Sequence, residues 1–195
     1  LNTIQDAPLT INQFMLEVVN FCWESGELVD KFPRKEYYEY PQIPDNYEEL
    51  TDKEKKGWRL KCKELMIKNR EVDGARAVFD QDLRTARELS EYDEFYLPWN
   101  LCFRGRCYPV PFFNYHRDSH VKSLFLFRNK QKVTNDGFNW LCIHIANVGD
   151  FERISKASLD DRLQWAVDNQ EMIYNCGRDF ITHIDTWKSA DKPFE

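Results

Sequence analysis

The stretch that organises the chain is residues 96–132, which read YLPWNLCFRGRCYPVPFFNYHRDSHVKSLFLFRNKQK. The whole protein carries a formal net charge of -6, yet Pro98 to Lys132 hold seven basic residues and one acidic residue. Aromatic side chains lie between the basic ones throughout. Because cations bind phosphates and aromatic faces stack on bases, this composition indicates a nucleic-acid-binding surface. A half-buried strand with solvated charges has the same composition, so both interpretations stay open.

This stretch also predicts a short strand pair followed by a helix. The Arg-Gly-Arg step at 104–106 indicates a tight bend between one strand and a second strand at 108–113. Asp118 or Ser119 can then cap a helix over 121–127. The strand pair would carry most of the aromatic and basic side chains of the stretch.

The N-terminal side predicts a helix and an irregular connector. Apolar residues recur at helical spacing over 9–31, and Thr10 can cap a helix there. The prolines and tyrosines of 32–46 make a regular element improbable. If a second helix follows, two antiparallel helices of unequal length would project as an arm from a body.

That second helix is expected to begin at Thr51, which stands three residues before Glu54 as in a capping box. It continues to about residue 89, with a possible break at Gly74. Its buried stripe would contain Trp58, Leu65, Val72, Phe79 and Leu83. Its solvent side is dense in cations: Lys53, Lys55, Lys56, Arg59, Lys61, Lys63, Lys68 and Arg70. Such a face either contacts phosphates or is simply solvated, because acidic residues alternate with the lysines.

The C-terminal side predicts further helices. One begins at Thr134, a loop follows at 148–157, and Ser158 caps another helix that Gly177 ends. The tail 179–195 has no clear period. The expected fold class is therefore mainly α with a small β element (α+β), in one large domain or two small ones.

Composition also bears on the protein class. The six cysteines are widely spaced and form no CxxC pair, so we expect reduced, mostly buried thiols and an intracellular setting. No apolar run approaches the roughly 20 residues that span a bilayer. No signal peptide is recognisable at the N-terminus.

Catalytic motifs are missing from the sequence. There is no glycine-rich phosphate loop and no G-x-S-x-G elbow. His116 and His120 have i,i+4 spacing without an HExxH frame, which argues against a metal site. His144 lies in an apolar helical stretch, where a buried core histidine is expected. The acidic pair Asp160 and Asp161 opens a helix, where the helix dipole favours carboxylates. The residues themselves indicate polyanion binding rather than catalysis.

Three motifs resemble the single-subunit DNA-dependent RNA polymerases of phages and mitochondria. They are FYLPWNLCFRGRCYPVPFFN, then DSHVKSLFLF, then GFNWLCIHIAN, and they match the family's F-Y-x-P-x-N-x-(D/T)-x-R-G-R-x-Y segment and its successors without a gap. Weaker similarity covers APLTINQFMLEVVN and WKSADKPFE. The resemblance implies that residues 1–94 are the helical thumb and its connection. It implies that 95–195 are the first part of the polymerase palm.

The resemblance also implies binding roles for four residues. Arg104 and Arg106 match the arginines that hold the RNA–DNA hybrid near the growing 3′ end, where a guanidinium fork suits phosphates and sugar hydroxyls. Tyr108 matches the tyrosine lying against the template beside the active site. Lys122 matches the palm lysine that contacts the nucleic-acid backbone.

Two further positions match the family less well. Arg153, or less favourably Lys156, falls near the family's basic residue for the triphosphate of the incoming nucleotide, across an insertion. Cys102 replaces the family's acidic or hydroxyl residue two positions before the first motif arginine. A thiol lacks the charge and hydrogen bonds of a carboxylate, so the group that this residue orients is expected to be held differently.

In the family, the two catalytic aspartates that hold Mg²⁺ lie downstream of the position matched by Glu195, as do the lysine and tyrosine of the fingers. The resemblance therefore implies an incomplete DNA-directed RNA polymerase, inactive alone: either a piece of a longer enzyme or the N-terminal subunit of a split phage enzyme. A second polypeptide would bring the catalytic residues, and 180–194 would form the interface.

The implied ligands are DNA template, RNA transcript and nucleoside triphosphates, with no membrane. The implied location is the host cytoplasm for a phage enzyme, or alternatively the mitochondrial matrix. The alternative function is a non-catalytic nucleic-acid-binding module built on the polymerase scaffold.

Overall fold

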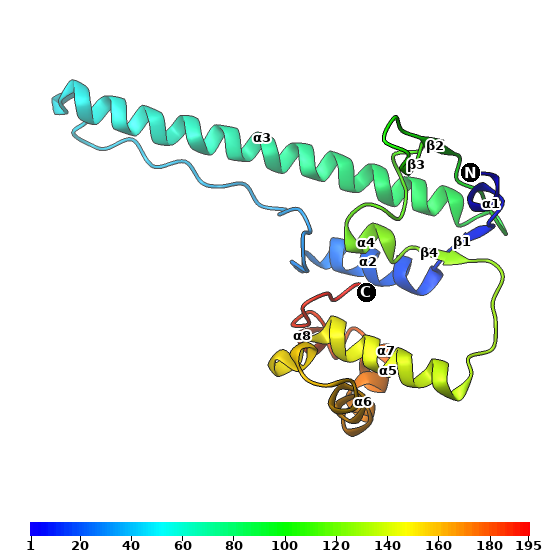
Figure 1. Cartoon of the computed structure of the whole chain (residues 1–195). Helices are drawn as coiled ribbons and strands as arrows, with labels where there is room; N and C mark the ends of the chain where they lie inside the picture. Colours follow the sequence, from blue (N-terminus) through cyan, green and yellow to red (C-terminus); the bar gives the residue numbers. More distant parts are fainter.

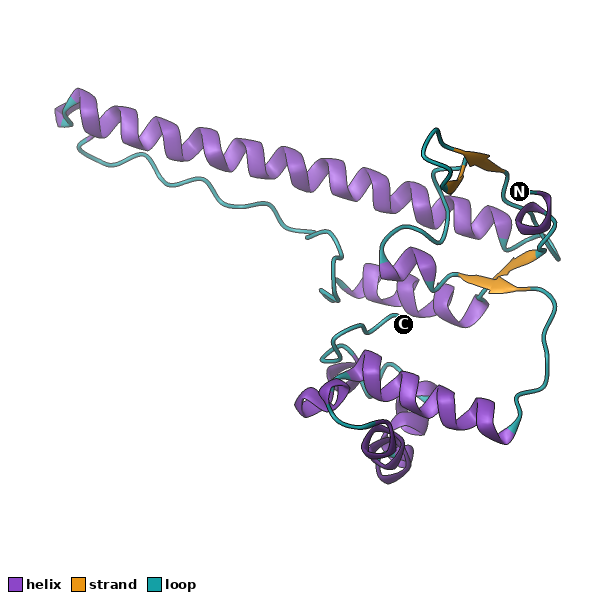
Figure 2. Cartoon of the chain, in the orientation of Figure 1, coloured by secondary structure: helices purple, strands orange, loops and turns teal.

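The computed structural model describes residues 1–195 and shows an extended arm, a small body and a C-terminal group of helices (Figure 1). The helices are α1 (Asn2–Gln5), α2 (Gln13–Ser25), α3 (Asp52–Leu89), α4 (Ser119–Lys122), α5 (Asn135–Gly149), α6 (Leu159–Asp168), α7 (Gln170–Arg178) and α8 (Ile184–Trp187), with 3-10 turns η1 (Tyr47–Glu49) and η2 (Phe151–Lys156). The strands are β1 (Leu9–Ile11), β2 (Trp99–Leu101), β3 (Cys107–Pro109) and β4 (Phe125–Phe127). Helices dominate and the strands are short (Figure 2), which confirms the expected fold class.

Helix α3 forms the arm. The predicted capping box is present: the Thr51 hydroxyl accepts from the Glu54 N–H, and the Thr51 N–H donates to the Glu54 carboxylate at 2.9 Å. The helix runs unbroken for 38 residues, which is about 57 Å at 1.5 Å per residue. Gly74 does not break it, because one internal glycine costs a helix only about 1 kcal/mol.

The connector between α2 and α3 lies along the arm (Figure 1). The Asn69 side chain of α3 bonds both backbone groups of Tyr38 in the connector. Its Oδ1 accepts from the Tyr38 N–H at 2.8 Å, and its Nδ2 donates to the Tyr38 carbonyl at 3.0 Å. The Arg76 Nε donates to the Arg34 carbonyl at 2.8 Å. The arm is therefore one helix and an extended strap, and the prediction of two projecting helices was wrong.

The prediction of a helix over 9–31 was also wrong for its first residues. Residues 9–11 form β1, which pairs antiparallel with β4 so that Leu9 faces Phe127 and Ile11 faces Phe125. Helix α2 begins only after Asn12, whose side chain accepts from the Met15 N–H at 3.3 Å. It has 13 residues and ends at Gly26, where a φ of 81° favours glycine.

The helix predicted over 121–127 is shorter than expected. Helix α4 ends at Lys122, and Phe125–Phe127 form β4 against β1. Val121 of α4 and Leu124, which stands between α4 and β4 in the sequence, are fully buried. The local spacing of apolar residues suits a helix. Pairing of Phe125–Phe127 with β1, near the N-terminus, instead supplies the backbone hydrogen bonds that a helix would make.

The core lies where α2, the C-terminal part of α3, α4 and the end of the chain meet. The Phe32 and Phe194 rings stack with their centroids 5.1 Å apart. His120 packs against Phe32 and Phe79 at 5.3 and 5.0 Å, and burial lowers its pKa to about 4. Phe180 is also buried here. The prediction that 180–194 forms an interface was therefore wrong for its two phenylalanines, which fill the chain's own core.

The C-terminal helices begin at the predicted caps. The Thr134 hydroxyl accepts from the Gly137 N–H at 3.1 Å, and Ser158 forms a capping box with Asp161. The single helix predicted after Ser158 is two helices, α6 and α7, because the backbone leaves the helical region at Asn169 (φ -102°, ψ 14°). The loop predicted at 148–157 contains the turn η2.

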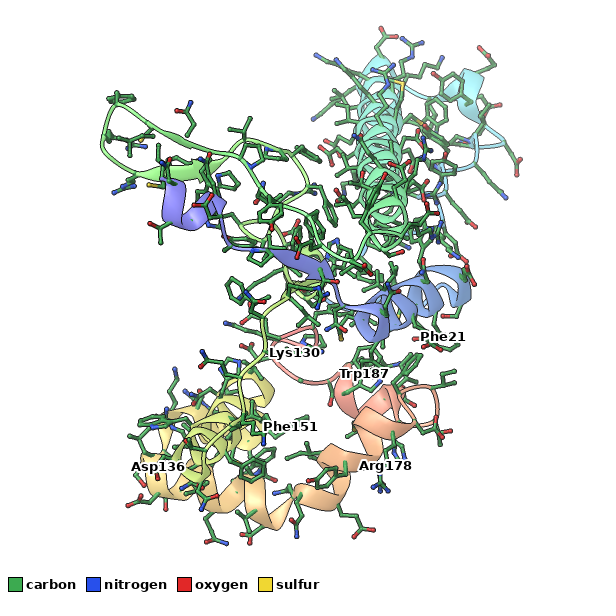
Figure 3. The ribbon with its side chains drawn as sticks, turned by 90° about the vertical axis from the view of Figure 1, so that its right-hand side faces the viewer. Phe21, Lys130, Asp136, Phe151, Arg178 and Trp187 are labelled. Atoms are coloured by element: carbon green, nitrogen blue, oxygen red, sulfur yellow. The ribbon has the colours of Figure 1, made fainter.

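His144 is not the core histidine that was expected. Its side chain is exposed on α5, whereas Cys142, Ile143 and Ala146 form the buried face. The rings of Phe151 in η2 and Trp165 in α6 stack with their centroids 5.8 Å apart, which joins the turn after α5 to α6. Trp187 lies on the side of the C-terminal segment that faces α2 (Figure 3), and its indole N–H donates to the Phe180 carbonyl at 2.7 Å.

A buried ion pair joins the arm to the body. Arg117 Nη1 donates to Asp82 Oδ1 at 2.7 Å, with 17% of the arginine side chain and 3% of the aspartate exposed. The guanidinium also lies 4.0 Å from the centroid of the Phe112 ring. Burial raises the pKa of Asp82, and the Arg117 charge opposes that rise. The pair therefore fixes the residues before α4 to the base of α3.

All six cysteines are free thiols, as predicted. Only Cys22 and Cys142 are fully buried, so the expectation of mostly buried thiols was wrong for the other four. None of the helices is both long enough and apolar enough to span a lipid bilayer.

Candidate nucleic-acid interface

The predicted strand pair exists and presents a rigid turn. Strands β2 and β3 pair antiparallel, with Trp99 opposite Pro109, Asn100 opposite Tyr108 and Leu101 opposite Cys107. Two backbone hydrogen bonds of 2.9 Å close the turn, from Cys102 N to the Arg106 carbonyl and from Gly105 N to the Cys102 carbonyl. Gly105 has a φ of 74°, a conformation that other residues rarely adopt. The second strand ends earlier than the predicted 108–113.

Arg104 and Arg106 lie at the tip of this hairpin. Both side chains are exposed, and neither forms an ion pair within 4 Å of a carboxylate. The Arg104 guanidinium lies 5.6 Å from the centroid of the Phe103 ring. Tyr108 is exposed on β3 of the same hairpin. The fold thus brings three of the predicted residues together, with two cations free to take anionic ligands.

Lys122 lies elsewhere, on α4, and is engaged within the chain. Its Nζ is 3.0 Å from Glu195 Oε1, and Lys192 Nζ lies 3.4 Å from the other oxygen. The hydrogen bond from Lys122 and its charge hold the pKa of Glu195 below its usual value. Lys122 would have to exchange this carboxylate for a phosphate to bind nucleic acid.

Glu195 also borders a polar cavity of about 590 Å³. The cavity is lined by Asp30, Lys31, His116, Arg117, Asp118, Ser119, Asp191, Lys192 and Glu195. Within it, Lys31 pairs with Asp118 at 3.4 Å, and the Ser119 hydroxyl donates to Asp30. Most of its charges are thus paired, and it offers no concentrated charge of one sign.

Arg153 lies in the turn η2, far along the chain from the hairpin. It is exposed and has a φ of 65°; Glu152 and Asp150 share this left-handed conformation at 54° and 45°. Asp150 Oδ1 accepts from the Ser155 N–H at 2.9 Å, which holds the turn and keeps the pKa of Asp150 below its usual value. The structure does not bring Arg153 or the neighbouring Lys156 to the hairpin tip.

Two sets stand out among the cations of α3. Four of them contact the connector. Lys55 Nζ donates to the Glu48 carbonyl at 2.9 Å, Arg59 Nε donates to the Tyr47 hydroxyl at 3.2 Å, Lys68 lies over the Tyr38 ring, and Arg76 donates to the Arg34 carbonyl as described above. Another set has a regular spacing of seven residues or its multiple, and comprises Lys56, Lys63, Arg70 and Arg84, which we call the basic stripe.

Seven residues are nearly two helical turns, so the members of the basic stripe lie on one side of α3. The buried Val72 and Phe79 lie about 180–200° round the helix from Arg70. All four stripe side chains are exposed and without an ion pair. The stripe therefore points away from the buried face of α3, and none of its members makes a hydrogen bond to the connector. Arg84 was not among the cations predicted from the sequence, although its spacing of 14 residues from Arg70 indicates the same side of the helix.

Comparisons with known proteins show that the chain is similar to RNA polymerases. Residues 131–195 match a family model described as DNA-dependent RNA polymerase. The chain is 28% identical over 196 residues to DNA-directed RNA polymerase 1B, mitochondrial, of Nicotiana tabacum, with 100% of this chain and 19% of that protein aligned. It is 28% identical over 197 residues to DNA-directed RNA polymerase 1, mitochondrial, of Arabidopsis thaliana, with 100% and 20% aligned.

The mitochondrial DNA-directed RNA polymerase of Neurospora crassa is 30% identical over 187 residues, which are 95% of this chain and 13% of that protein. The chain thus spans a fifth or less of the length of these relatives. The resemblance to the single-subunit phage and mitochondrial RNA polymerases is confirmed, since the homology to organellar enzymes extends along the whole chain.

Proposed function

We propose that this chain is the part of a DNA-directed RNA polymerase that holds the RNA–DNA hybrid and the template during transcription. The observation that carries the proposal is the pair of arginines, Arg104 and Arg106, exposed without carboxylate partners at the tip of a rigid hairpin. Unpaired guanidinium forks at a fixed position suit phosphates and sugar hydroxyls. Homology to organellar RNA polymerases over the whole chain supports the same assignment.

In this proposal residues 1–94 are the thumb with its connection, and 95–195 are the first part of the palm. The basic stripe from Lys56 to Arg84 covers about 42 Å of helix. A nucleic-acid strand carries a phosphate about every 3.4 Å in B-form DNA and somewhat closer in an A-like hybrid, so the stripe can follow several phosphates. The exposed Tyr108 would lie against the template, and Lys122 would contact the backbone after releasing Glu195.

Nucleotidyl transfer by the two-metal mechanism needs carboxylates that together hold the ions. The chain contains no group of three or more His, Cys, Asp or Glu side chains placed to hold a metal ion. Its residues therefore do not fit Mg²⁺, and we assign the catalytic aspartates and the Mg²⁺ to another segment or a second polypeptide. On this basis the chain alone is inactive, and Arg153 is the candidate for a triphosphate contact.

The relatives named above carry the word mitochondrial in their names. This favours the mitochondrial matrix over the cytoplasm of a phage-infected host as the location of this chain. The proposed ligands are the DNA template, the RNA transcript and nucleoside triphosphates.

The direction in which the arm faces nucleic acid can be tested with two charge-matched variants. Lys56→Ala with Lys63→Ala removes two lysines from the basic stripe, whereas Lys61→Ala with Lys68→Ala removes two from the connector side at the same spacing. The affinity of the chain for an RNA–DNA hybrid is measured by fluorescence anisotropy across a salt series. The stripe pair should reduce the slope of log K against log salt by up to about 1.8, because each lost phosphate contact is worth roughly 0.9.

The connector-side pair is expected to leave that slope nearly unchanged. If both variants reduced the slope of log K against log salt equally, the arm would bind the hybrid only through its total charge. A larger loss for Lys61 and Lys68 would place the hybrid on the other side of α3.

A further inference from the structure

The hairpin tip carries an aromatic ring that the fold does not use. Phe103 is 97% exposed, and no other large apolar side chain of the chain exceeds 65%. The turn is closed by backbone hydrogen bonds and by the left-handed Gly105, so the ring is not needed to form it. An apolar ring held in water by a rigid turn gains nothing for the folded chain, and such surfaces commonly mark binding sites.

The surroundings of Phe103 point to nucleic acid as its ligand. It stands directly before Arg104, whose guanidinium lies 5.6 Å from the ring centroid, and three residues before Arg106. Neither arginine has a carboxylate partner within 4 Å. A ring beside free cations matches a base attached to a phosphate, because bases stack on aromatic faces while guanidinium groups bind the backbone.

The ligand of the ring must have an open base face. Inside a duplex each base is covered on both sides by its neighbours, so a ring cannot stack there without separating two base pairs. A ring projecting from a tight turn can instead stack on a base at the end of a duplex or in a single strand.

We propose that Phe103 stacks on an unpaired base at the edge of the RNA–DNA hybrid, so that the hairpin tip recognises the junction between duplex and single strand. This inference rests on the proposed function, since it requires that the hairpin binds nucleic acid. Beyond the proposed function, it specifies the ligand of the hairpin tip as a junction between duplex and single strand, rather than a continuous duplex.

The test uses the purified full chain and two labelled hybrids. One is a blunt RNA–DNA hybrid, and the other has a single-stranded DNA extension with 2-aminopurine as the first unpaired base. Anisotropy gives the affinity for each, and 2-aminopurine emission reports stacking on the unpaired base. The variants are Phe103→Ala, Phe103→Tyr, Arg106→Ala and, as a control for losing an exposed ring elsewhere, Tyr92→Ala.

Phe103→Ala should weaken binding of the extended hybrid by about tenfold, leave the blunt hybrid within about twofold, and abolish the change in 2-aminopurine emission. Phe103→Tyr should restore both signals, and Tyr92→Ala should change neither. Arg106→Ala should weaken both hybrids. If the chain binds both hybrids but Phe103→Ala changes neither, or weakens both equally, the junction proposal is wrong and the ring serves a protein contact or general affinity. If the chain binds neither hybrid, the proposed function fails together with the junction.

Discussion

Replacing Arg106 with alanine is expected to weaken the hold on the RNA–DNA hybrid by about ten- to a hundredfold. The side chain has no carboxylate partner that would be left behind, so the loss reflects the missing ligand contact. A hydrogen bond to a charged group contributes about 1.5–3 kcal/mol, and each 1.4 kcal/mol is a factor of about ten. The rate at which a labelled hybrid dissociates from the chain, or from an elongating complex that contains it, measures the effect.

Lys61→Ala is the control, because it removes one exposed cation from the connector side of α3. It should change the dissociation rate by less than about threefold, as expected for one distant, screened charge. Arg106→Lys keeps the charge but loses the guanidinium fork, and an intermediate rate is expected. If Arg106→Ala and Lys61→Ala had equal effects, the motif arginine would contribute only charge.

The second large effect concerns stability. Arg117→Ala should lower the free energy of unfolding by about 3–5 kcal/mol, because it leaves the Asp82 carboxylate buried without its partner. The other oxygen of that carboxylate, Oδ2, has no hydrogen-bond partner, so Arg117 supplies the only hydrogen bond to the Asp82 side chain. The variant also loses the contact between the guanidinium and the Phe112 ring. Urea unfolding at neutral pH gives the difference.

Lys31→Ala is the matched control, since Lys31 also pairs with an aspartate but 72% of its side chain is exposed. Its loss should be less than about 1 kcal/mol. The Arg117→Ala loss should shrink as the pH falls. Burial raises the pKa of Asp82 in the folded state, so protonation relieves the penalty first in the folded chain. A loss for Arg117→Ala no larger than that for Lys31→Ala would show that the ion pair does not join the arm to the body.

Features that depend on a few adjacent residues were predictable from the sequence. The caps at Thr51, Thr134 and Ser158 each lie beside the backbone groups that they satisfy, so the local pattern suffices. Pairing between β1 and β4 was not predictable in this way, because Leu9 and Phe127 meet only after the body has folded. The burial of Phe194 depends equally on distant partners, including Phe32.

In the candidate site, too, the features set by adjacent residues were predictable and those set by distant residues were not. The bend that carries Arg104 and Arg106 follows from the glycine between them, and the motif spacing indicated the hairpin. The pairing of Lys122 with Glu195 joins segments that lie far apart in the sequence, and no local signal announces it. Phe103 was predicted only as one of the aromatic residues of 96–132, because an aromatic residue in a turn carries no sign of its exposure until the hydrogen bonds around it are known.

RNA synthesis by the purified chain tests the central claim most directly. The chain is given a template annealed to an RNA primer, Mg²⁺ and the four nucleoside triphosphates, alone or with a polypeptide that carries the two catalytic aspartates of the family. We expect no primer extension by the chain alone and extension when the second polypeptide is added. Primer extension by the chain alone would contradict the assignment of the catalytic carboxylates to another segment.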